Sequence, residues 1–262
     1  MKKIDKIFHF QKYKLEHNKN FDEILNNKRI KILDFFQKKF KKNFYGNILD
    51  FGSGNGYATV YLVKKFNLRK IISLEGSKYA AKVLLPSVLK HFNLKNKVKI
   101  QYSDFTKINK KKYFDFVISF GSLHHSSCLF STMKSISKSM KTNSYLICHE
   151  PISDKYTTNS YFQKKYNSLE KKYGLTFKNK ERDDHFFRES EYLVAAYHNN
   201  LDLVYMKKHN LNETSLLLNI KMSIKKFIKS KIFKKHNIGE VNDYILIFKK
   251  GKNITPPHLF NY

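Results

Sequence analysis

The chain has 262 residues, of which 41% are hydrophobic and 15% aromatic, which is enough for the core of one enzyme-sized domain and excludes a disordered chain. It contains no run of about 18 apolar residues, so a membrane-spanning helix is excluded, and the first residues lack the apolar segment of a signal peptide. Its two cysteines, Cys128 and Cys148, cannot form a disulfide framework. We therefore expect a cytoplasmic protein.

The formal net charge of +30 favours binding to nucleic acid or another polyanion. Arginine is the better group for phosphate and guanine, yet only four of the 51 basic residues are arginines, at positions 29, 69, 182 and 188. The abundant Lys, Asn, Ile, Phe and Tyr share A/T-rich codons, which indicates a coding bias. The charge is therefore a weak functional signal.

In chain order, helical spacing predicts a lead-in over 1–45, followed by short apolar runs that alternate with amphipathic stretches. The expected strands are 47–51, 70–75, 97–102, 114–120 and 143–149, and the expected helices are 56–66, 77–92 and 128–140. Pro86 is expected to kink or end the second of these helices. This alternation predicts an α/β fold with a doubly wound, Rossmann-like, mostly parallel sheet over the core 46–150.

Residues 151–188 interrupt this alternation with a polar, aromatic segment, interpreted as a lid inserted over a substrate or as packing at the sheet edge. A helix is then expected from its N-cap at Ser190 to about Asn199. The region 189–262 adds two strands, 201–206 and 244–248, around a Lys-rich insertion over 209–242. Without repeats or a long linker, the sequence predicts a single domain over 1–262.

Three of the nine glycines, Gly52, Gly54 and Gly56, lie between a predicted strand and a predicted helix, shortly after Asp50. Glycine permits a positive φ and a close ligand approach, and the following helix N-terminus suits a carboxylate or phosphate. A tight turn without a ligand is the alternative, but the position between strand and helix favours ligand binding. The spacing D-x-G-x-G-x-G differs from the G-x-G-x-x-G of dinucleotide sites.

Two further strands end in carboxylates. Glu75 could accept both hydroxyls of a ribose, from a nicotinamide dinucleotide or an adenosyl ligand, and would repel a 2′-phosphate. Asp104 could accept from an adenine amino group while Phe105 packs on the base. The alternatives are a solvated strand-end carboxylate for Glu75 and a turn cap for Asp104. Open α/β sheets bind ligands at the carboxyl ends of successive strands, where all these residues are expected.

Together, residues 48–57, Glu75, Asp104 with Phe105, and 114–120 resemble the motifs of class I S-adenosylmethionine-dependent methyltransferases. The resemblance covers about residues 45–150, and the final helix and two strands resemble the closing antiparallel hairpin of that fold. It implies S-adenosylmethionine as cofactor, with the methionine part near the three glycines supported by Asp50, the ribose on Glu75, and the adenine at Asp104 and Phe105. Ser119, at the end of the fourth strand, is a further expected cofactor residue.

The run Ser119–His125 follows the fourth predicted strand, where the methyl group would face its acceptor. It lacks the (Asp/Asn)-Pro-Pro-aromatic motif of many amino-group methyltransferases, and its Leu-His-His resembles small-molecule enzymes instead. His124 and His125 are candidate general bases for a hydroxyl acceptor, and His149 is another candidate. A structural role is the alternative for these histidines, and a nitrogen acceptor in its free-base form would need no base.

The densest acidic cluster comprises Asp183, Asp184, His185 and Glu189. Methyltransferases that use a divalent ion hold it on loops of the core sheet, whereas this cluster lies in the later insertion. We therefore expect no metal, and assign the cluster to a loop, a helix start or a substrate contact.

An apolar stripe at helical spacing over 220–235, surrounded by lysines, could lie on an anionic membrane or rest on the fold, and the second interpretation is favoured. The predicted function is methyl transfer to a small or carrier-linked acceptor at oxygen, with saccharides and lipid-linked intermediates as candidates. The alternatives are an RNA methyltransferase, which scarce arginine disfavours, and a noncatalytic protein of the same fold that binds anionic surfaces. No pattern predicts the oligomeric state.

Overall fold

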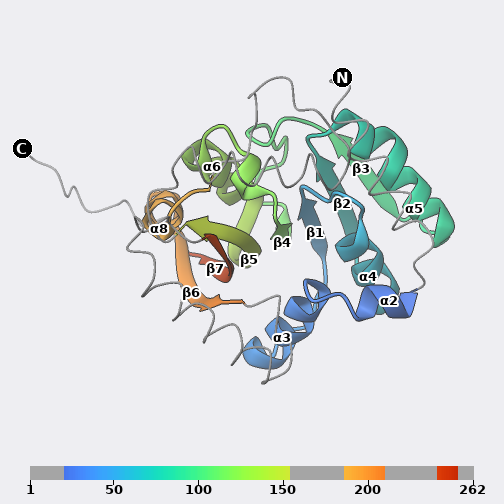
Figure 1. Ribbon diagram of the computed structural model, residues 1–262, viewed down its shortest axis with the longest axis horizontal. Helices are drawn as coiled ribbons and strands as arrows, with labels where there is room; N and C mark the ends of the chain where they lie inside the picture. The colour runs from blue at the N-terminus through green and yellow to red at the C-terminus, as the bar shows by residue number, and fades with distance from the viewer. Residues whose placement is uncertain (1–20, 154–185, 210–240, 253–262) are drawn as a thin grey trace, which may run out of the picture.

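The computed structural model describes residues 21–153, 186–209 and 241–252 (Figure 1). Seven strands form one sheet in the order β3-β2-β1-β4-β5-β7-β6. The first five strands pair in parallel, and β7 runs antiparallel to both β5 and β6. The expected mostly parallel Rossmann-like sheet with a closing antiparallel hairpin is thus confirmed.

All seven expected strands are present, with these bounds: β1 Asn47–Phe51, β2 Lys70–Glu75, β3 Val98–Tyr102, β4 Phe114–Phe120, β5 Met140–Ser153, β6 Leu201–Lys208 and β7 Val241–Lys250. The largest difference is in β5, which is longer than 143–149. Its pairing with β7 continues from Tyr145 to Ser153, so backbone hydrogen bonds extend the strand beyond the apolar run. The residues 151–153 therefore belong to the sheet.

The helices include α2 Phe21–Leu25, α3 Ile30–Phe40, α4 Tyr57–Lys65, α5 Leu85–His91, α6 Leu129–Ser139 and α8 Glu189–Tyr197. A π-helical turn, Ala80–Leu84, runs directly into α5, so Pro86 lies in the first turn of α5 and does not end the helix. The change from π-helical to α-helical turns occurs next to this proline, which has no N–H to donate. The N-cap predicted at Ser190 is wrong. The cap is Arg188, which has an extended backbone, and its N–H donates to the Glu191 carboxylate at 2.7 Å.

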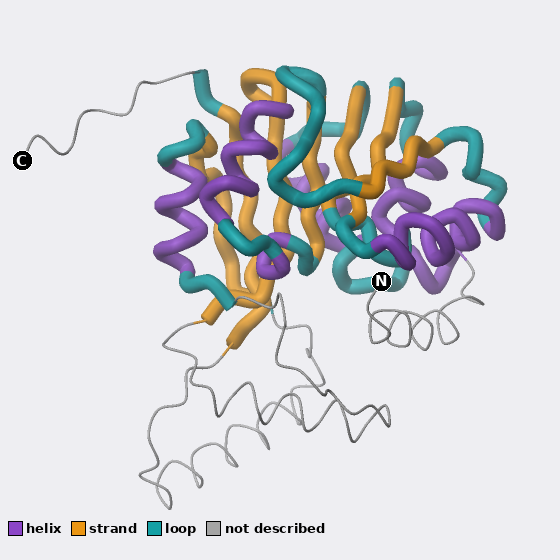
Figure 2. Tube along the Cα trace, turned by 90° about the horizontal axis from the view of Figure 1, so that it is seen from above, coloured by secondary structure: helices purple, strands orange, loops and turns teal. Residues whose placement is uncertain are grey.

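Helices cover both faces of the sheet (Figure 2), and each face has its own hydrophobic layer. Helices α2 to α5 pack on one face, which includes Ile147, and α6 with α8 pack on the other, which includes Cys148. Because side chains alternate along a strand, His149 and Glu150 at the end of β5 point to opposite faces. None of the helices in the described ranges is long and apolar enough to cross a membrane.

Candidate active site

The loop after β1 is held by backbone hydrogen bonds to the end of β2. The N–H of Gly52 donates to the Leu74 carbonyl at 2.8 Å, and the N–H of Gly54 donates to the Glu75 carboxylate at 2.7 Å. Gly52, Gly54 and Gly56 have φ angles of +66°, +54° and +75°, in the left-handed region that L side chains rarely adopt. The chain therefore needs glycine at all three positions.

The three glycines differ in what a side chain would meet. A Cβ at Gly52 would collide with the Ser122 side chain, and one at Gly56 would collide with Leu85. Among the described residues, the nearest atom to a Cβ at Gly54 would be the Gly52 carbonyl oxygen, 4.0 Å away, so these residues leave space there. Gly52 and Gly56 thus permit close packing, whereas Gly54 leaves room for a ligand to approach the backbone.

Asp50 lies beneath this loop and is only 3% exposed. It accepts a hydrogen bond from the Thr59 hydroxyl of α4 at 2.5 Å, and Thr59 also contacts the Ser73 hydroxyl of β2 at 2.6 Å. Burial raises the pKa of Asp50 to about 6, and the negative charge of Glu75 contributes to the same shift. Asp50 therefore ties β1 to the start of α4 and supports the loop through the helix.

Glu75 lies at the end of β2, 7% exposed, and accepts from the N–H groups of Gly54 and Ser77 at 2.7 and 2.8 Å. A carboxylate oxygen has two lone pairs, so each oxygen can still accept a ribose hydroxyl. The described residues also leave space beside Gly54. The remaining lone pairs of Glu75 and this space therefore fit the ribose and methionine parts of an adenosyl ligand.

Asp104 and Phe105 follow β3, next to the glycine loop. One Asp104 oxygen accepts from the N–H and the hydroxyl of Thr106 at 2.7 and 2.6 Å, and these hydrogen bonds lower its pKa. Asp104 thus makes the turn-capping contact that was its alternative role. The Phe105 ring packs 4.6 Å from the ring of Phe51, and a Cβ at Gly76 would lie 3.3 Å from it. Phe105 therefore lies against the strand ends, where the adenine is expected.

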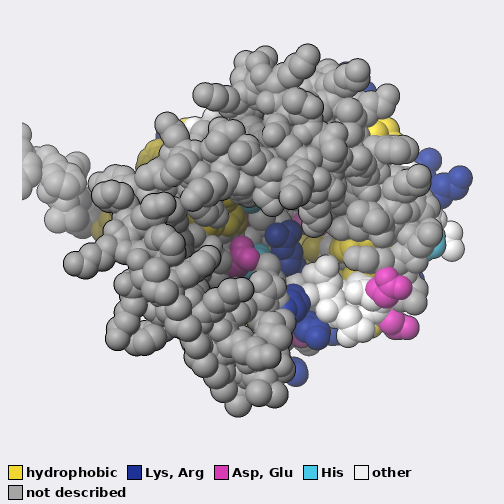
Figure 3. All heavy atoms as spheres, viewed as in Figure 1, with side chains coloured by type: hydrophobic (Ala, Val, Ile, Leu, Met, Phe, Trp, Pro, Cys, Tyr) yellow, Lys and Arg dark blue, Asp and Glu magenta, His cyan; other side chains and the backbone are white. Residues whose placement is uncertain are grey.

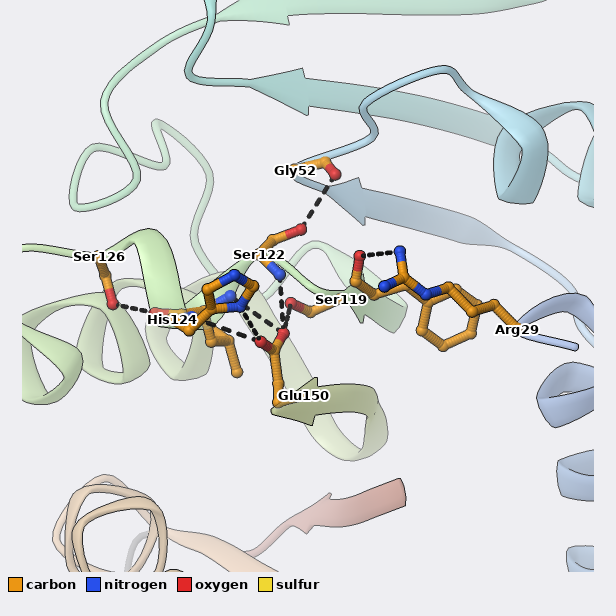
Figure 4. Close-up of polar contacts among 9 residues, drawn as sticks. Arg29, Gly52, Ser119, Ser122, His124, Ser126 and Glu150 are labelled. Atoms are coloured by element: carbon orange, nitrogen blue, oxygen red, sulfur yellow. Dashed lines mark hydrogen bonds and ion pairs between the residues drawn. The ribbon is translucent and has the colours of Figure 1, made fainter. Parts of the chain in front are cut away.

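The loop after β4 is organised by Glu150, a fully buried carboxylate at the end of β5 (Figure 4). Its Oε1 accepts from the Ser119 hydroxyl at 3.1 Å and from the N–H groups of Ser122 and Leu123 at 2.9 and 3.0 Å. The other oxygen accepts from His124 Nδ1 at 2.9 Å and from its N–H at 3.4 Å. Ser122 in turn donates its hydroxyl to the Gly52 carbonyl at 3.0 Å, which joins this loop to the glycine loop.

Glu150 is ionised although it is buried. Burial alone opposes the charge, but the hydrogen bond and charge of His124, with the N–H groups of Leu123 and Ser122, lower its pKa. An ionised carboxylate can only accept, so His124 donates through Nδ1 and, in the neutral ring, leaves Nε2 as an acceptor.

The two adjacent histidines differ in environment. The His124 side chain is 12% exposed and its ring stacks on Phe186 at 6.1 Å, whereas His125 is exposed. The third candidate, His149, is fully buried, and burial, with the charges of Arg29 and His209, lowers its pKa to about 3. His149 is therefore a weak base, and the structure favours His124.

Three further residues, Glu150, Arg29 and Tyr192, belong to the site although no sequence motif indicated them. Arg29 precedes α3 and donates to the Phe120 carbonyl at the end of β4, at 3.5 Å. The buried Tyr192 of α8 lies close enough to Glu150 for that charge to raise its pKa, after the larger effect of burial. No periodicity marks these residues, because they reach the site from distant segments. Only Glu150, directly after a predicted strand, carried a positional signal.

No group of three potential metal ligands is present in residues 21–153, 186–209 and 241–252. Of the acidic cluster considered above, Glu189 begins α8, while Asp183, Asp184 and His185 lie outside the described residues.

A family model described as a methyltransferase domain matches residues 10–205, which is most of the chain. The chain is a class I S-adenosylmethionine-dependent methyltransferase. This confirms the enzyme class expected from the sequence. No curated protein sequence matches the chain.

Several solved structures share the fold at low sequence identity. A candidate sarcosine dimethylglycine methyltransferase from Galdieria sulphuraria has a TM-score of 0.60 at 16% identity, over 86% of this chain and 85% of that one. A geranyl diphosphate methyltransferase in complex with S-adenosylmethionine has a TM-score of 0.61 at 11% identity, over 85% of each chain. The [4+2]-cyclase SpnF has a TM-score of 0.57 at 12% identity, covering 84% of this chain and 81% of SpnF. Such distant likeness supports the fold and leaves the acceptor to be inferred from the site.

Proposed function

We propose that this methyltransferase transfers the methyl group to an oxygen atom of a small or carrier-linked acceptor, with His124 as the general base. The supporting observation is the 2.9 Å hydrogen bond between His124 Nδ1 and the buried Glu150 carboxylate, on the loop that also contacts Gly52. S-adenosylmethionine, when bound, supplies an activated methyl group on a positively charged sulfur. A hydroxyl acceptor must lose its proton, and His124 Nε2 is the group that takes it.

The cofactor residues keep their proposed roles. Gly54 and Glu75 would hold the methionine and ribose parts, and Phe105 the adenine, with Gly52, Gly56 and Asp50 shaping the loop. Ser119 is fully buried and donates to Glu150, so we assign it to the support of the loop beside the cofactor. Asp104 keeps one carboxylate oxygen outside its turn hydrogen bonds with Thr106, and this oxygen is the one proposed for the adenine amino group.

The acceptor class can be tested with cofactor carrying a ¹³C-labelled methyl group. The purified protein is incubated with three fractions of the source cells: water-soluble metabolites, extracted lipids and lipid-linked saccharides, and total RNA. We expect label in one of the first two fractions, in a methoxy group that carbon NMR distinguishes from N-methyl and C-methyl groups. Label confined to RNA, or to nitrogen or carbon, would refute the proposal.

The base is tested once a labelled acceptor is in hand, by comparing His124→Gln with His125→Gln. General-base catalysis contributes about 10²–10⁴-fold, so we expect the rate of His124→Gln to fall within that range while cofactor affinity is unchanged. A larger loss in His125→Gln than in His124→Gln would show that the assignment is wrong.

The basic stripe over 220–235 lies outside the described residues. Peripheral contact of this stripe with an anionic membrane remains part of the proposal, on the sequence pattern alone. The check is co-sedimentation with vesicles of anionic and neutral lipid at low and high salt. If the protein binds anionic vesicles equally well after Lys225, Lys226 and Lys229 are changed to Glu, the proposed membrane contact is wrong.

A further inference from the structure

A second polar cluster lies at the same end of the sheet, on the face opposite Glu150. It contains Arg29, before α3, His149 at the end of β5, and Asp243 in β7. Asp243 pairs with Pro151, two residues beyond His149, and Phe120, whose carbonyl accepts from Arg29, pairs with His149 between β4 and β5. The charge of Arg29 accordingly affects the pKa values of both His149 and Asp243. Three segments far apart in sequence thus place their polar side chains together beside the loop after β4.

The Arg29 guanidinium is held at the end of β4. It reaches toward the end of β4, near Ser119 (Figure 4), where it donates to the Phe120 carbonyl at 3.5 Å. One of its nitrogens would lie 3.1 Å from a Cβ at Gly121, so glycine permits the close approach. Arg29 forms no ion pair with any residue in the described part of the chain. Most of its five N–H donors therefore remain available to a ligand.

His149 gives an independent indication of a ligand. It is 0% exposed, and neither ring nitrogen has a hydrogen-bond partner among the described residues. A buried polar group without a partner is unfavourable, so each such group in a folded protein calls for an explanation, and a bound ligand is one. Figure 3 shows basic, acidic and histidine side chains close together near the centre of this face of the molecule.

We propose that Arg29 and His149 form an acceptor subsite that binds an anionic group, a carboxylate or a phosphate, and that Asp243 limits its affinity. The planar guanidinium can donate two parallel hydrogen bonds to such a group, and a neutral imidazole can donate a third. Asp243 is the carboxylate that opposes an incoming anion. The inference rests on the proposed function, because it makes the acceptor an anionic molecule.

The position favours the acceptor over the cofactor as the source of the anion. The cofactor residues lie on the ends of β1, β2 and β3, whereas Arg29 contacts β4 and its charged neighbours lie on β5 and β7, farther along the sheet. His124, the proposed base, follows β4 and contacts Glu150, whereas Arg29 contacts the Phe120 carbonyl of the same strand. Figure 4 shows His124 and Arg29 on opposite sides of Ser119, so an anion at Arg29 would hold the acceptor on the side of Ser119 opposite His124.

The subsite can be tested without knowing the acceptor. Binding of S-adenosylhomocysteine to the wild type is measured first by calorimetry, which tests the cofactor site by itself. The loaded protein is then titrated with phosphate and with pyrophosphate. We expect Arg29→Gln to weaken anion binding by at least about tenfold, Arg29→Lys to weaken it less, and Asp243→Asn to strengthen it.

Arg69→Gln is the matched control, because it removes the same charge from an exposed position before β2, at the other end of the strands. Equal losses in Arg29→Gln and Arg69→Gln would mean that anions bind the general positive charge, and the inference would be wrong. The inference would also be wrong if Arg29→Gln weakened the binding of S-adenosylhomocysteine but not the binding of 5′-methylthioadenosine, because Arg29 would then bind the cofactor carboxylate. Thermal unfolding of each variant confirms folding, and Arg29→Lys retains the test if Arg29→Gln is unstable.

Discussion

Replacing Glu150 with Gln tests the central contact of the site. The glutamine oxygen can keep the three hydrogen bonds of Oε1, from the Ser119 hydroxyl and the N–H groups of Ser122 and Leu123. The amide NH₂ then replaces the oxygen that accepts from the ring and the N–H of His124, so donors face donors. The imidazole can relieve half of this conflict by moving its proton from Nδ1 to Nε2. We therefore expect Glu150→Gln to reverse the His124 tautomer, which removes the Nε2 acceptor needed for a base.

The magnitude follows from the contacts that change. A hydrogen bond to a charged group contributes about 1.5–3 kcal/mol, and two such bonds to His124 are lost. The tautomer change recovers one neutral hydrogen bond, and the neutral amide avoids the burial of a charge. We expect a net loss of about 2–4 kcal/mol in the free energy of unfolding, or roughly 5–15 °C in the melting temperature.

Chemical denaturation in urea and ¹⁵N NMR of the imidazole nitrogens measure the two effects. The pKa of Glu150 is lower in the folded state than its ordinary value of 4.5, so at a pH near 4.5 the folded state binds fewer protons than the unfolded state. Its stabilisation is therefore complete above that pH and is lost as the pH falls through the folded-state pKa, and Glu150→Gln should lack this loss. Unchanged stability with His124 still protonated at Nδ1 would refute the reasoning.

Three further predictions concern the proposed cofactor loop. Gly52→Ala should lose about 2–5 kcal/mol of stability, measured by urea titration, from strain and the collision with Ser122. Gly54→Ala should lose only roughly 1–2 kcal/mol of stability, but calorimetry should show weaker binding of S-adenosylhomocysteine. Burial raises the folded-state pKa of Asp50 from 3.8 to about 6. Its contribution to the free energy of unfolding therefore falls by about 3 kcal/mol as the pH rises from about 4 to 6. Asp50→Asn should remove this part of the dependence of stability on pH. Glu75→Ala should weaken S-adenosylhomocysteine binding at least about tenfold, and an unchanged affinity would contradict the ribose assignment.

The strand and helix positions of the core were predictable because they depend on local patterns. Buried strands of a parallel sheet are continuous apolar runs, and β1, β2 and β4 begin and end at the residues expected from the sequence. The positive φ angles of Gly52, Gly54 and Gly56 likewise depend on the loop itself, which is why glycine spacing indicated the ligand-binding turn.

Element ends were harder to predict where pairing or capping decides them. β5 continues to Ser153 because β7 provides hydrogen-bond partners there, and β7 is almost a hundred residues away in sequence. Arg188 caps α8 through its backbone, a role that carries no preference for its side chain, so the sequence pointed to Ser190 instead.

The sequence by itself determined the fold class and the glycine loop between β1 and α4, since both follow from short-range periodicity and from glycines at fixed spacing. Only the tertiary structure distinguished His124 from His125, because the difference between two adjacent histidines is the Glu150 carboxylate, which lies on another strand. The same holds for Arg29, His149 and Asp243, which long-range folding brings together from three segments. A charge of +30 read from composition could not reveal Arg29, which forms no ion pair within the described residues, because electrostatic function depends on distance and burial.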